Sequence, residues 1–378
     1  PYGTYTVEQI RGWDGVDMIA PFDVQISQNG QVYRYIINDA VMQAYIRIVK
    51  KDAESGSVIP STGCAFQIYD PQGHLVTMSV TYPEAATLDT FYTGTDGQLI
   101  TPQRLPYGTG YSLVEVQAPH GYVVNPDPVY FDITEDSSSE EGGIVIVSVE
   151  KADMPQKGII RVEKTGEMFT SVQSNGEMYV PVFAAHGLPG AVFEITAAED
   201  IVTPDGTIHY TAGQVVDTVT TGEDGSAVSK ELYLGQYTIR ETAAPAGMVL
   251  NPEVKTVELQ YAGQEVAVTE AMTSLTNQRQ KASLSLRKEL ETDTVFGYTG
   301  QSGVTSATFG LYAAETLTAL DGSSIPADGL IEIAAAQEDG SVRFTADIPF
   351  GQYYVKEISA PPAYLPDGTA YPLIFAPA

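Results

Sequence analysis

Alternating apolar and polar residues recur along this chain in short stretches, and the clearest of them end in glutamate. Three stretches place a tyrosine, an aliphatic residue and a glutamate at positions i, i+2 and i+4: Tyr111/Leu113/Glu115, Tyr237/Ile239/Glu241 and Tyr353/Val355/Glu357. A period of two predicts a β-strand that carries these three side chains on one face. Because tyrosine and aliphatic side chains favour the interior, we expect each glutamate inside an apolar core, where a carboxylate needs a partner or a task.

A second alternating strand precedes each of these stretches and ends in lysine. The three strands are Ile46–Lys50, Ile160–Lys164 and Leu284–Lys288. In each strand the lysine shares a face with the aliphatic residues. A surface lysine instead keeps its amine in water while its stem covers apolar surface. The pattern therefore predicts that these lysines point inward, as the glutamates do.

An amide or acid follows the glutamate strand in two of the repeats. Asp153 and Asn277 stand at matching positions, each eleven residues before the next repeated lysine, and Asn38 stands twelve residues before Lys50. The ordered set of lysine, glutamate and Asn or Asp is complete twice. The complete sets are Lys50, Glu115, Asp153 and Lys164, Glu241, Asn277.

The combined motifs resemble the B-type repeat domains of collagen adhesins (Cna-B-like domains), which also occur in pilins of Gram-positive bacteria. The resemblance rests on the tyrosine–glutamate box, which continues into Ala-Pro, and on a G-A-x-F-x-I-Y strand at 63–69, 190–195 and 306–312. It covers nearly the whole chain. It implies an all-β fold of tandem Ig-like β-sandwich domains arranged end to end. It also implies an intramolecular isopeptide bond between Lys and Asn or Asp, with Glu as catalyst.

On this resemblance, the expected bonds are Lys50–Asp153 and Lys164–Asn277, and the expected catalysts are Glu115, Glu241 and Glu357. Burial lowers the pKa of a lysine and raises that of a glutamic acid, so a neutral amine can attack a carbonyl that the acid polarises. Each domain reacts once with itself, which makes the chain no enzyme in the sense of turnover. An ordinary buried ion pair is the alternative interpretation of each site. Lys151 has the same strand parity as Asp153, which leaves open which of the two faces inward.

The set is incomplete at both ends of the chain. In the opening phrase GTYTVEQIRGWDG, Gln9 replaces the glutamate, and an amide cannot act as the acid. Asn38 is then a candidate partner for a lysine outside this chain, or a turn residue. Lys288 and Glu357 precede no strand with an acceptor. These ends are interpreted as a cut from a longer protein, with donor-strand exchange between copies as the alternative.

Composition narrows the class of protein. The net charge of −29 argues against a nucleic acid or an anionic membrane surface as partner. The only cysteine, Cys64, occupies a small-residue position of a core strand, so no disulfide is expected. The four histidines share no spacing, and the acidic run at 135–141 lacks the ligand alternation of a calcium loop, so we expect neither a metal nor a cofactor. No apolar run reaches membrane-spanning length.

The repeats predict the tail of an upstream Cna-B-like domain at 1–43, domains at 44–155 and 156–279, and a domain without its last strand at 280–378. Linkers are almost absent between them, and an insert at Glu167–Pro189 is expected to form a protruding loop or an added hairpin. The leading functional hypothesis is a stalk segment of an adhesin or pilus-like fibre on the bacterial cell surface, attached to the cell wall through regions outside this chain. The alternatives are a module that binds host glycan or matrix protein, and an accessory region of a secreted enzyme.

Overall fold

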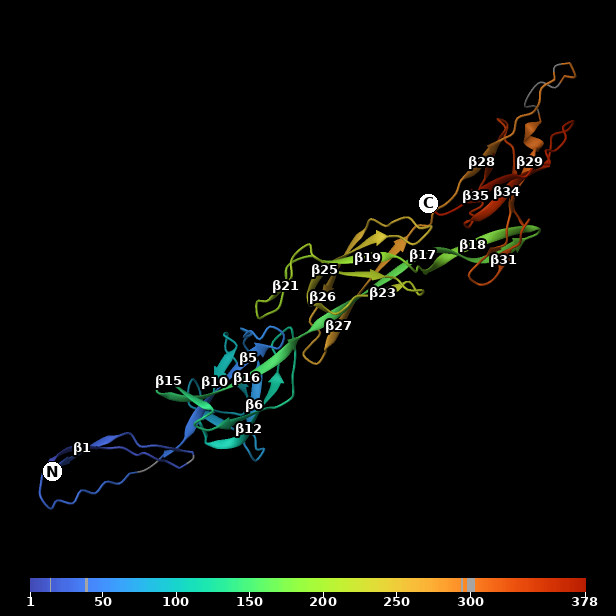
Figure 1. The fold of residues 1–378 in the computed structure, drawn as a ribbon. Coiled ribbons are helices and arrows are strands. Elements are labelled where there is room, and N and C mark those ends of the chain that lie inside the picture. The colour runs from blue at the N-terminus through green and yellow to red at the C-terminus, as the bar shows by residue number, and fades with distance from the viewer. Residues whose placement is uncertain (14, 38–39, 294, 298–302) are drawn as a thin grey trace.

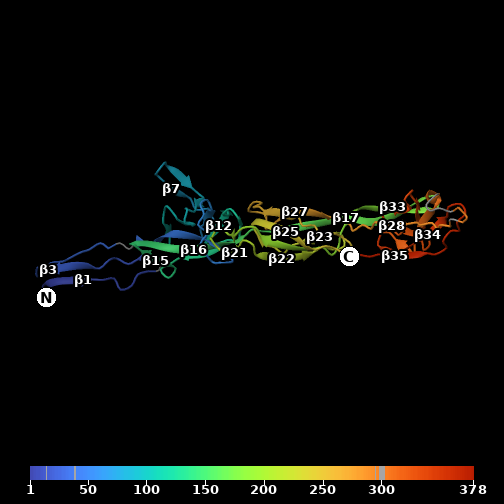
Figure 2. The same cartoon turned by 90° about the horizontal axis from the view of Figure 1, so that it is seen from above.

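The computed structural model describes residues 1–13, 15–37, 40–293, 295–297 and 303–378, and it is an elongated row of β-structures (Figure 1). Strands dominate because the alternating pattern recurs throughout the chain. The regular elements of the described residues are strands apart from one short 3-10 helix, η1 (Val304–Ser306). A second view, from above, shows the same end-to-end order (Figure 2). The predicted all-β fold class is confirmed.

The opening segment is a thin ribbon that extends from the end of the row (Figure 1). In it β1 (Gly3–Val7) pairs with β3 (Phe22–Ile26), and β2 (Val16–Asp17) pairs with β4 (Ala40–Val41), both antiparallel. Most of its side chains are exposed, so it contributes no core of its own. Its assignment to an upstream domain stays a prediction.

The first sandwich packs a six-stranded sheet against a four-stranded one. The larger sheet comprises β5 (Gln43–Asp52), β10 (Gln98–Ile100), β11 (Leu105–Pro106), β13 (Tyr122–Val123), β15 (Ser138–Glu141) and β16 (Ile144–Pro155). The smaller sheet comprises β6 (Ala65–Tyr69), β9 (Phe91–Tyr92), β12 (Gly108–Gln117) and β14 (Val129–Ile133), with a separate hairpin of β7 (Met78–Val80) and β8 (Ala86–Leu88). The alternate residues Ile46, Ile48, Phe66 and Leu113 meet in its core, together with the buried Cys64.

The second sandwich repeats this plan. One layer comprises β17 (Lys157–Asn175), β18 (Met178–Gly187), β23 (Ser226–Val228), β24 (Leu232–Tyr233) and β27 (Val268–Asn277). The other comprises β19 (Val192–Ala197), β22 (Val215–Thr220), β25 (Gly235–Ala243) and β26 (Val254–Leu259), with a hairpin of β20 (Ile201–Val202) and β21 (Ile208–Tyr210). Its core again gathers the alternate residues of these strands, such as Ile160, Val162, Phe193 and Ile239.

The third sandwich also contains a strand with the tyrosine–glutamate box, but the layer that includes its first strand is incomplete. Its larger layer comprises β29 (Thr308–Ala313), β32 (Leu330–Ala335), β34 (Gly351–Ser359) and β35 (Tyr371–Phe375). β28 (Leu284–Arg287) pairs with β33 (Ser341–Phe344), and β30 (Leu317–Thr318) pairs with β31 (Ser324–Ile325).

The last strand of each of the first two sandwiches returns to lie beside its first strand. β16 pairs with β5, and β27 pairs with β17, in both cases in parallel. Among the described residues of the third sandwich, β28 pairs only with β33, so no last strand lies beside it. A chemical link between first and last strands is thus sterically open to the first two sandwiches.

The insert at Glu167–Pro189 is a long hairpin of β17 and β18 that reaches beyond its own sandwich (Figure 1). Met178 in β18 pairs with Leu330 in β32, so the sheets of the second and third sandwiches join into one nine-stranded sheet. Phe169, Val172 and Tyr179 pack against the core of the third sandwich. The hairpin is therefore shared between two domains.

Candidate functional site

The predicted trio of the first sandwich comes together in its core. Lys50 lies in β5, Asp153 lies in the adjacent β16, and Glu115 reaches them from β12 in the opposite sheet. Lys50 Nζ lies 2.8 Å from Glu115 Oε1 and 2.6 Å from Asp153 Oδ1, and none of the three side chains is exposed by more than 2%. The amine also lies 6.0 Å from the centre of the Phe66 ring. The three groups are therefore in contact and shielded from water.

The second sandwich brings its own trio together in the same way. Lys164 Nζ lies 3.1 Å from Glu241 Oε1, and Asn277 Nδ2 donates a hydrogen bond of 2.8 Å to the same oxygen. Glu241 Oε2 accepts a hydrogen bond of 2.8 Å from the backbone N–H of Asn251. Apart from the ion pair with Glu241, Lys164 Nζ has no hydrogen-bond partner among the described residues, and neither has Asn277 Oδ1. Unsatisfied buried polar atoms are rare, and they concentrate where a structure serves chemistry.

The two sites share one strand register. Lys50 is paired with Lys151 across β5 and β16, and Asp153 is two residues farther along β16. Lys164 is paired with Leu275 across β17 and β27, and Asn277 is again two residues farther along. The acceptor thus occupies the same position relative to its lysine in both sandwiches, as the repeat spacing predicts.

The third sandwich holds only the lysine and the glutamate. Lys288 Nζ lies 3.0 Å from Glu357 Oε1, and Glu357 Oε2 accepts a hydrogen bond of 2.7 Å from the backbone N–H of Asp367. The Lys288 side chain is 19% exposed, whereas that of Glu357 is 1% exposed. A groove of about 390 Å³ opens here beside β28, with Lys288 and Glu357 in its lining.

Burial changes the acid–base properties of these groups in the direction that condensation needs. Loss of hydration raises the pKa of Glu115 to about 8, and the neighbouring Asp153 carboxyl group adds to this effect. Burial lowers the pKa of Lys164, although the Glu241 carboxylate acts in the opposite direction. Condensation requires a protonated glutamic acid and a neutral lysine amine, and both shifts favour these forms.

The two remaining candidates lie away from these cores. Gln9 is in the opening ribbon, where its side-chain amide donates to the carbonyl of Arg11 and accepts from the backbone N–H of Ile19. Asn38 lies outside the described residues.

The sequence reasoning missed a backbone contact that orients the glutamates. The residue ten positions after Glu241 and Glu357 donates its backbone N–H to the carboxylate, from Asn251 and Asp367 respectively. Asn125 is the equivalent residue in the first sandwich, and its side chain donates to the carbonyl of Ala152 in the last strand. An Asn-Pro pair follows the box in the first two repeats, and that repeated pair was the signal available in the sequence.

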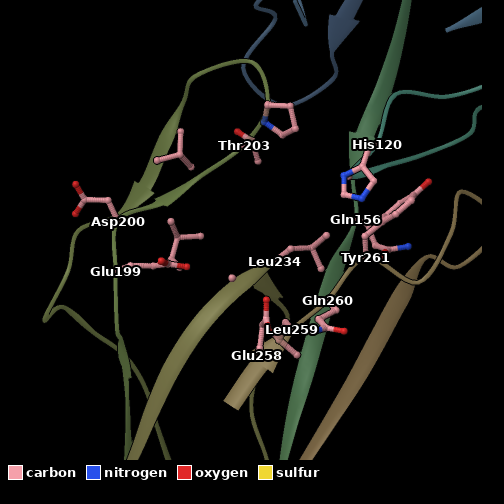
Figure 3. Close-up of a pocket in the computed structure, with 15 residues that line it drawn as sticks. His120, Gln156, Glu199, Asp200, Thr203, Leu234, Glu258, Leu259, Gln260 and Tyr261 are labelled. Carbon is pink, nitrogen blue, oxygen red and sulfur yellow. Dashed lines mark hydrogen bonds between the residues drawn. The ribbon is translucent and has the colours of Figure 1, made fainter. Parts of the chain in front are cut away.

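A separate groove of about 640 Å³ lies at the junction of the first and second sandwiches (Figure 3). His120 and Tyr261 pack together on one side of it, with ring centres 4.4 Å apart, and Glu199 and Asp200 lie on the opposite side. The part of the chain that the structure describes has no group of three or more His, Cys, Asp or Glu side chains placed to hold a metal ion. Nor does that part contain a helix long and apolar enough to cross a bilayer.

The fold and its paired lysines and glutamates define a protein of tandem prealbumin-like β-sandwiches. The family model of the SpaA prealbumin-like fold domain matches residues 44–144, 184–272 and 296–375, so the chain belongs to this family. The expected kinship with Cna-B-like repeat domains of Gram-positive adhesins and pilins is thereby confirmed. No curated protein matches the chain.

Solved structures with a similar arrangement include the TIE protein of Bacillus anthracis, with a TM-score of 0.53 and 20% identity over 98% of this chain. The chain spans 55% of the length of that protein. BcpA, the major pilin subunit of Bacillus cereus, is 15% identical over 88% of this chain and 94% of its own, with a TM-score of 0.30. A streptococcal ancillary pilin is 19% identical over 74% of this chain and 76% of its own, with a TM-score of 0.25.

Proposed function

We propose that this chain is a load-bearing stalk segment of a bacterial surface adhesin or pilus-like fibre, in which the first two sandwiches each close themselves with an isopeptide bond. The observation that carries the proposal is the repeated trio: a lysine on the first strand, an acceptor on the parallel last strand, and a glutamate above both. In this proposal the segment is extracellular, and regions outside it attach it to the cell wall. Its partners are the neighbouring domains of the same fibre.

The chemistry is a single condensation in each sandwich. Glu241 Oε1 accepts a hydrogen bond from Asn277 Nδ2, so the side-chain amide first turns about its Cβ–Cγ bond to bring its carbonyl oxygen to protonated Glu241. Neutral Lys164 then attacks the carbonyl carbon while Glu241 polarises that oxygen. Glu241 then carries the amine proton to the leaving group, and ammonia departs as the amide forms. In the first sandwich Lys50 attacks protonated Asp153 with Glu115 as the acid, and water departs. Each glutamate has the same number of protons after the reaction as before it.

The location of the bonds suits a protein under tension. Force enters a sandwich through its first strand and leaves through its last, and these strands lie side by side. A covalent tie between them carries the load past the core, so the enclosed strands cannot be pulled apart. If the tie acts like a disulfide around a loop of about a hundred residues, it also stabilises each sandwich by roughly 4–5 kcal/mol.

Intact mass measured in denaturant tests the proposal directly. We expect a deficit of about 35 Da against the sequence mass, from one ammonia and one water. Glu241→Ala should regain only the mass of the ammonia, and Glu115→Ala only the mass of the water. Each variant is therefore a control for the other. A wild-type chain at its full sequence mass would refute the isopeptide proposal.

Binding of host glycan or matrix protein is the second candidate function. The junction groove favours it, because the rings of the exposed His120 and the half-buried Tyr261 line it together with polar side chains, and ligand sites combine aromatic and polar groups in this way. The insert at Glu167–Pro189 does not favour it, since its apolar side chains are used against the third sandwich. A glycan and collagen array probed with wild type and with Tyr261→Ala tests this function. Equal signals from the two proteins would exclude the groove as its site.

A further inference from the structure

The acceptor is not the only residue that differs between the two complete sites. The residue paired in register with the site lysine is Lys151 in the first sandwich and Leu275 in the second. Both are buried, with exposed fractions of 1% and 2%. The site with the acidic acceptor Asp153 therefore has a second buried lysine, and the site with the neutral acceptor Asn277 has an aliphatic residue in its place.

Lys151 points into the same core as the trio. Its amine donates a hydrogen bond to the backbone carbonyl of Asp127, a residue whose own carboxylate is exposed. Burial lowers the pKa of this amine, and the carboxyl groups of Glu115, Asp153 and Asp127 oppose that effect through space, without an ion pair to Lys151 within 4.0 Å among the described residues. The sequence left open whether Lys151 or Asp153 faces inward, and the structure shows that both do.

A further buried carboxylate, that of Asp52, belongs to a different network. Its oxygens accept hydrogen bonds from the backbone N–H groups of Glu54 and Ser55 and from the hydroxyl of Tyr122. These three donors compensate its charge locally. The first site therefore contains two amines and two carboxyl groups, whereas the second contains one amine and one carboxyl group.

Equal numbers of amines and carboxyl groups allow every proton transfer to occur without a net buried charge. A net charge in a dry core is costly, and removing one member of a buried pair typically costs several kcal/mol. In the second site one proton moves from Lys164 to Glu241, and both reactive forms appear together. In the first site two carboxyl groups must be protonated, because an ionised carboxylate is a poor acyl acceptor, and Lys50 alone can supply only one proton.

We propose that Lys151 is the charge partner of Asp153, a positioning residue that supplies the second proton and so allows an acid, instead of an amide, to serve as the acceptor. This inference rests on the proposed isopeptide function. With Lys50 and Lys151 neutral and Glu115 and Asp153 protonated, the core has no net charge. Neutral Lys50 attacks the Asp153 carboxylic acid, and one water leaves. The product then contains an amide, one amine (Lys151) and one carboxyl group (Glu115), so the numbers of amines and carboxyl groups stay equal.

A double-substitution cycle in the full chain tests the inference. Lys151→Leu, Asp153→Asn and the combination of both are purified in denaturant, where the bond has not formed, and are then refolded. Mass spectrometry of the linked peptides over time measures the bond. We expect each single variant to form it at least about tenfold more slowly than wild type, because each leaves one charge unmatched. The combined variant copies the second site, so it should recover the rate and lose ammonia instead of water.

The second sandwich provides the reciprocal control. Leu275→Lys should slow bond formation there, and Leu275→Lys with Asn277→Asp should restore it with loss of water. If Lys151 only ties the strand to the Asp127 carbonyl, Lys151→Leu stays impaired when Asp153→Asn is added. That absence of rescue would overturn the inference, as would wild-type behaviour of Lys151→Leu alone.

Failure of the proposed function gives a different result from failure of this inference. If wild type forms no bond, all variants keep their full mass and the isopeptide proposal falls. The folding equilibrium constant, from urea unfolding, then still reports the charge pairing. Each single substitution should lower it by about tenfold or more, and the combination by clearly less than the product of the two. Simple multiplication of the two effects would show that Lys151 and Asp153 are not partners.

Discussion

Truncation of Phe169 should destabilise the third sandwich while leaving the second, to which its strand belongs, almost unchanged. Phe169 lies in β17, whose first half builds the second sandwich, yet its ring packs against the core of the third. It also contacts the ring of Phe183 in β18, with ring centres 5.9 Å apart. The core of the second sandwich contains no contribution from Phe169 among its described members.

The size of the effect follows from the burial of this ring. Replacing a fully buried phenylalanine by alanine costs about 3–5 kcal/mol. Phe169 is only partly buried, so we expect about half of this, roughly 2 kcal/mol. The main-chain bonds of this region remain, including the one from the Leu320 N–H to the Phe169 carbonyl, so the hairpin should stay docked.

Hydrogen exchange followed by mass spectrometry resolves the two sandwiches in one experiment. In Phe169→Ala, amides of β29 and β34 should exchange about thirtyfold faster, while those of β19 and β25 should not change. Val180→Ala is the matched control, because Val180 is on the same hairpin and exposed. Equal acceleration in both sandwiches, or acceleration in the second alone, would refute the assignment of the hairpin to the third core.

Three further predictions follow from the sites and turns. The pKa of Glu115 is raised from 4.5 to about 8, so the unreacted folded chain binds more protons than the unfolded one in that window. The free energy of unfolding, measured in urea, should therefore fall as the pH rises from about 4.5 to 8, and that of Glu115→Gln should not change over this range. Bond formation in the refolded first sandwich should slow above about pH 8. Gly225→Ala should destabilise the second sandwich by more than about 1 kcal/mol in thermal unfolding, because φ is +80° and a Cβ would lie 2.5 Å from the Lys164 carbonyl oxygen. Lys288→Ala should leave the intact-mass deficit unchanged, since no last strand lies beside β28 in the described residues; a smaller deficit would reveal an unrecognised third bond.

The sequence predicted the sandwiches and their trios because both depend on local alternation. A period of two decides which side chains of a strand share a face, and equal spacing between repeats decides which strands correspond. That reasoning placed Lys50, Glu115 and Asp153 in one core, and the structure brings them within contact distance. The isopeptide bonds between these residues stay a proposal.

Features that depend on distant parts of the chain could not be predicted in this way. The hairpin at Glu167–Pro189 was visible as an insert, but its apolar side chains fill a core whose other members come from beyond residue 280. The orientation of Lys151 was equally hidden, because a lysine tolerates burial only when opposite charges from other strands surround it. Alternation along β16 gives Lys151 and Asp153 the same face, but the Asp127 carbonyl that accepts the hydrogen bond of the Lys151 amine comes from another part of the chain.

The proposed load-bearing role depends on the junctions between sandwiches as well as on the proposed bonds inside them. One residue, Gln156, separates β16 from β17, and it is buried. Its side-chain amide donates to the carbonyls of Gly263 and Val266 and accepts from the N–H of Ala262, so the connection is fixed by hydrogen bonds to the second sandwich. At the next junction the guanidinium of Arg279 lies 3.8 Å from the centre of the Phe183 ring and pairs with Asp347.

Both junctions are therefore bridged by side chains as well as by the backbone. A flexible linker would store slack, which the first pull on the fibre would remove before any sandwich carried load. Here the last strand of one sandwich leads through Gln156 into the first strand of the next, and the β17–β18 hairpin extends the sheet across the second junction. Force applied along the row thus passes from strand to strand without a hinge. When this segment alone is pulled from its two ends, extension should begin in the third sandwich, because β28 pairs only with β33 among the described residues.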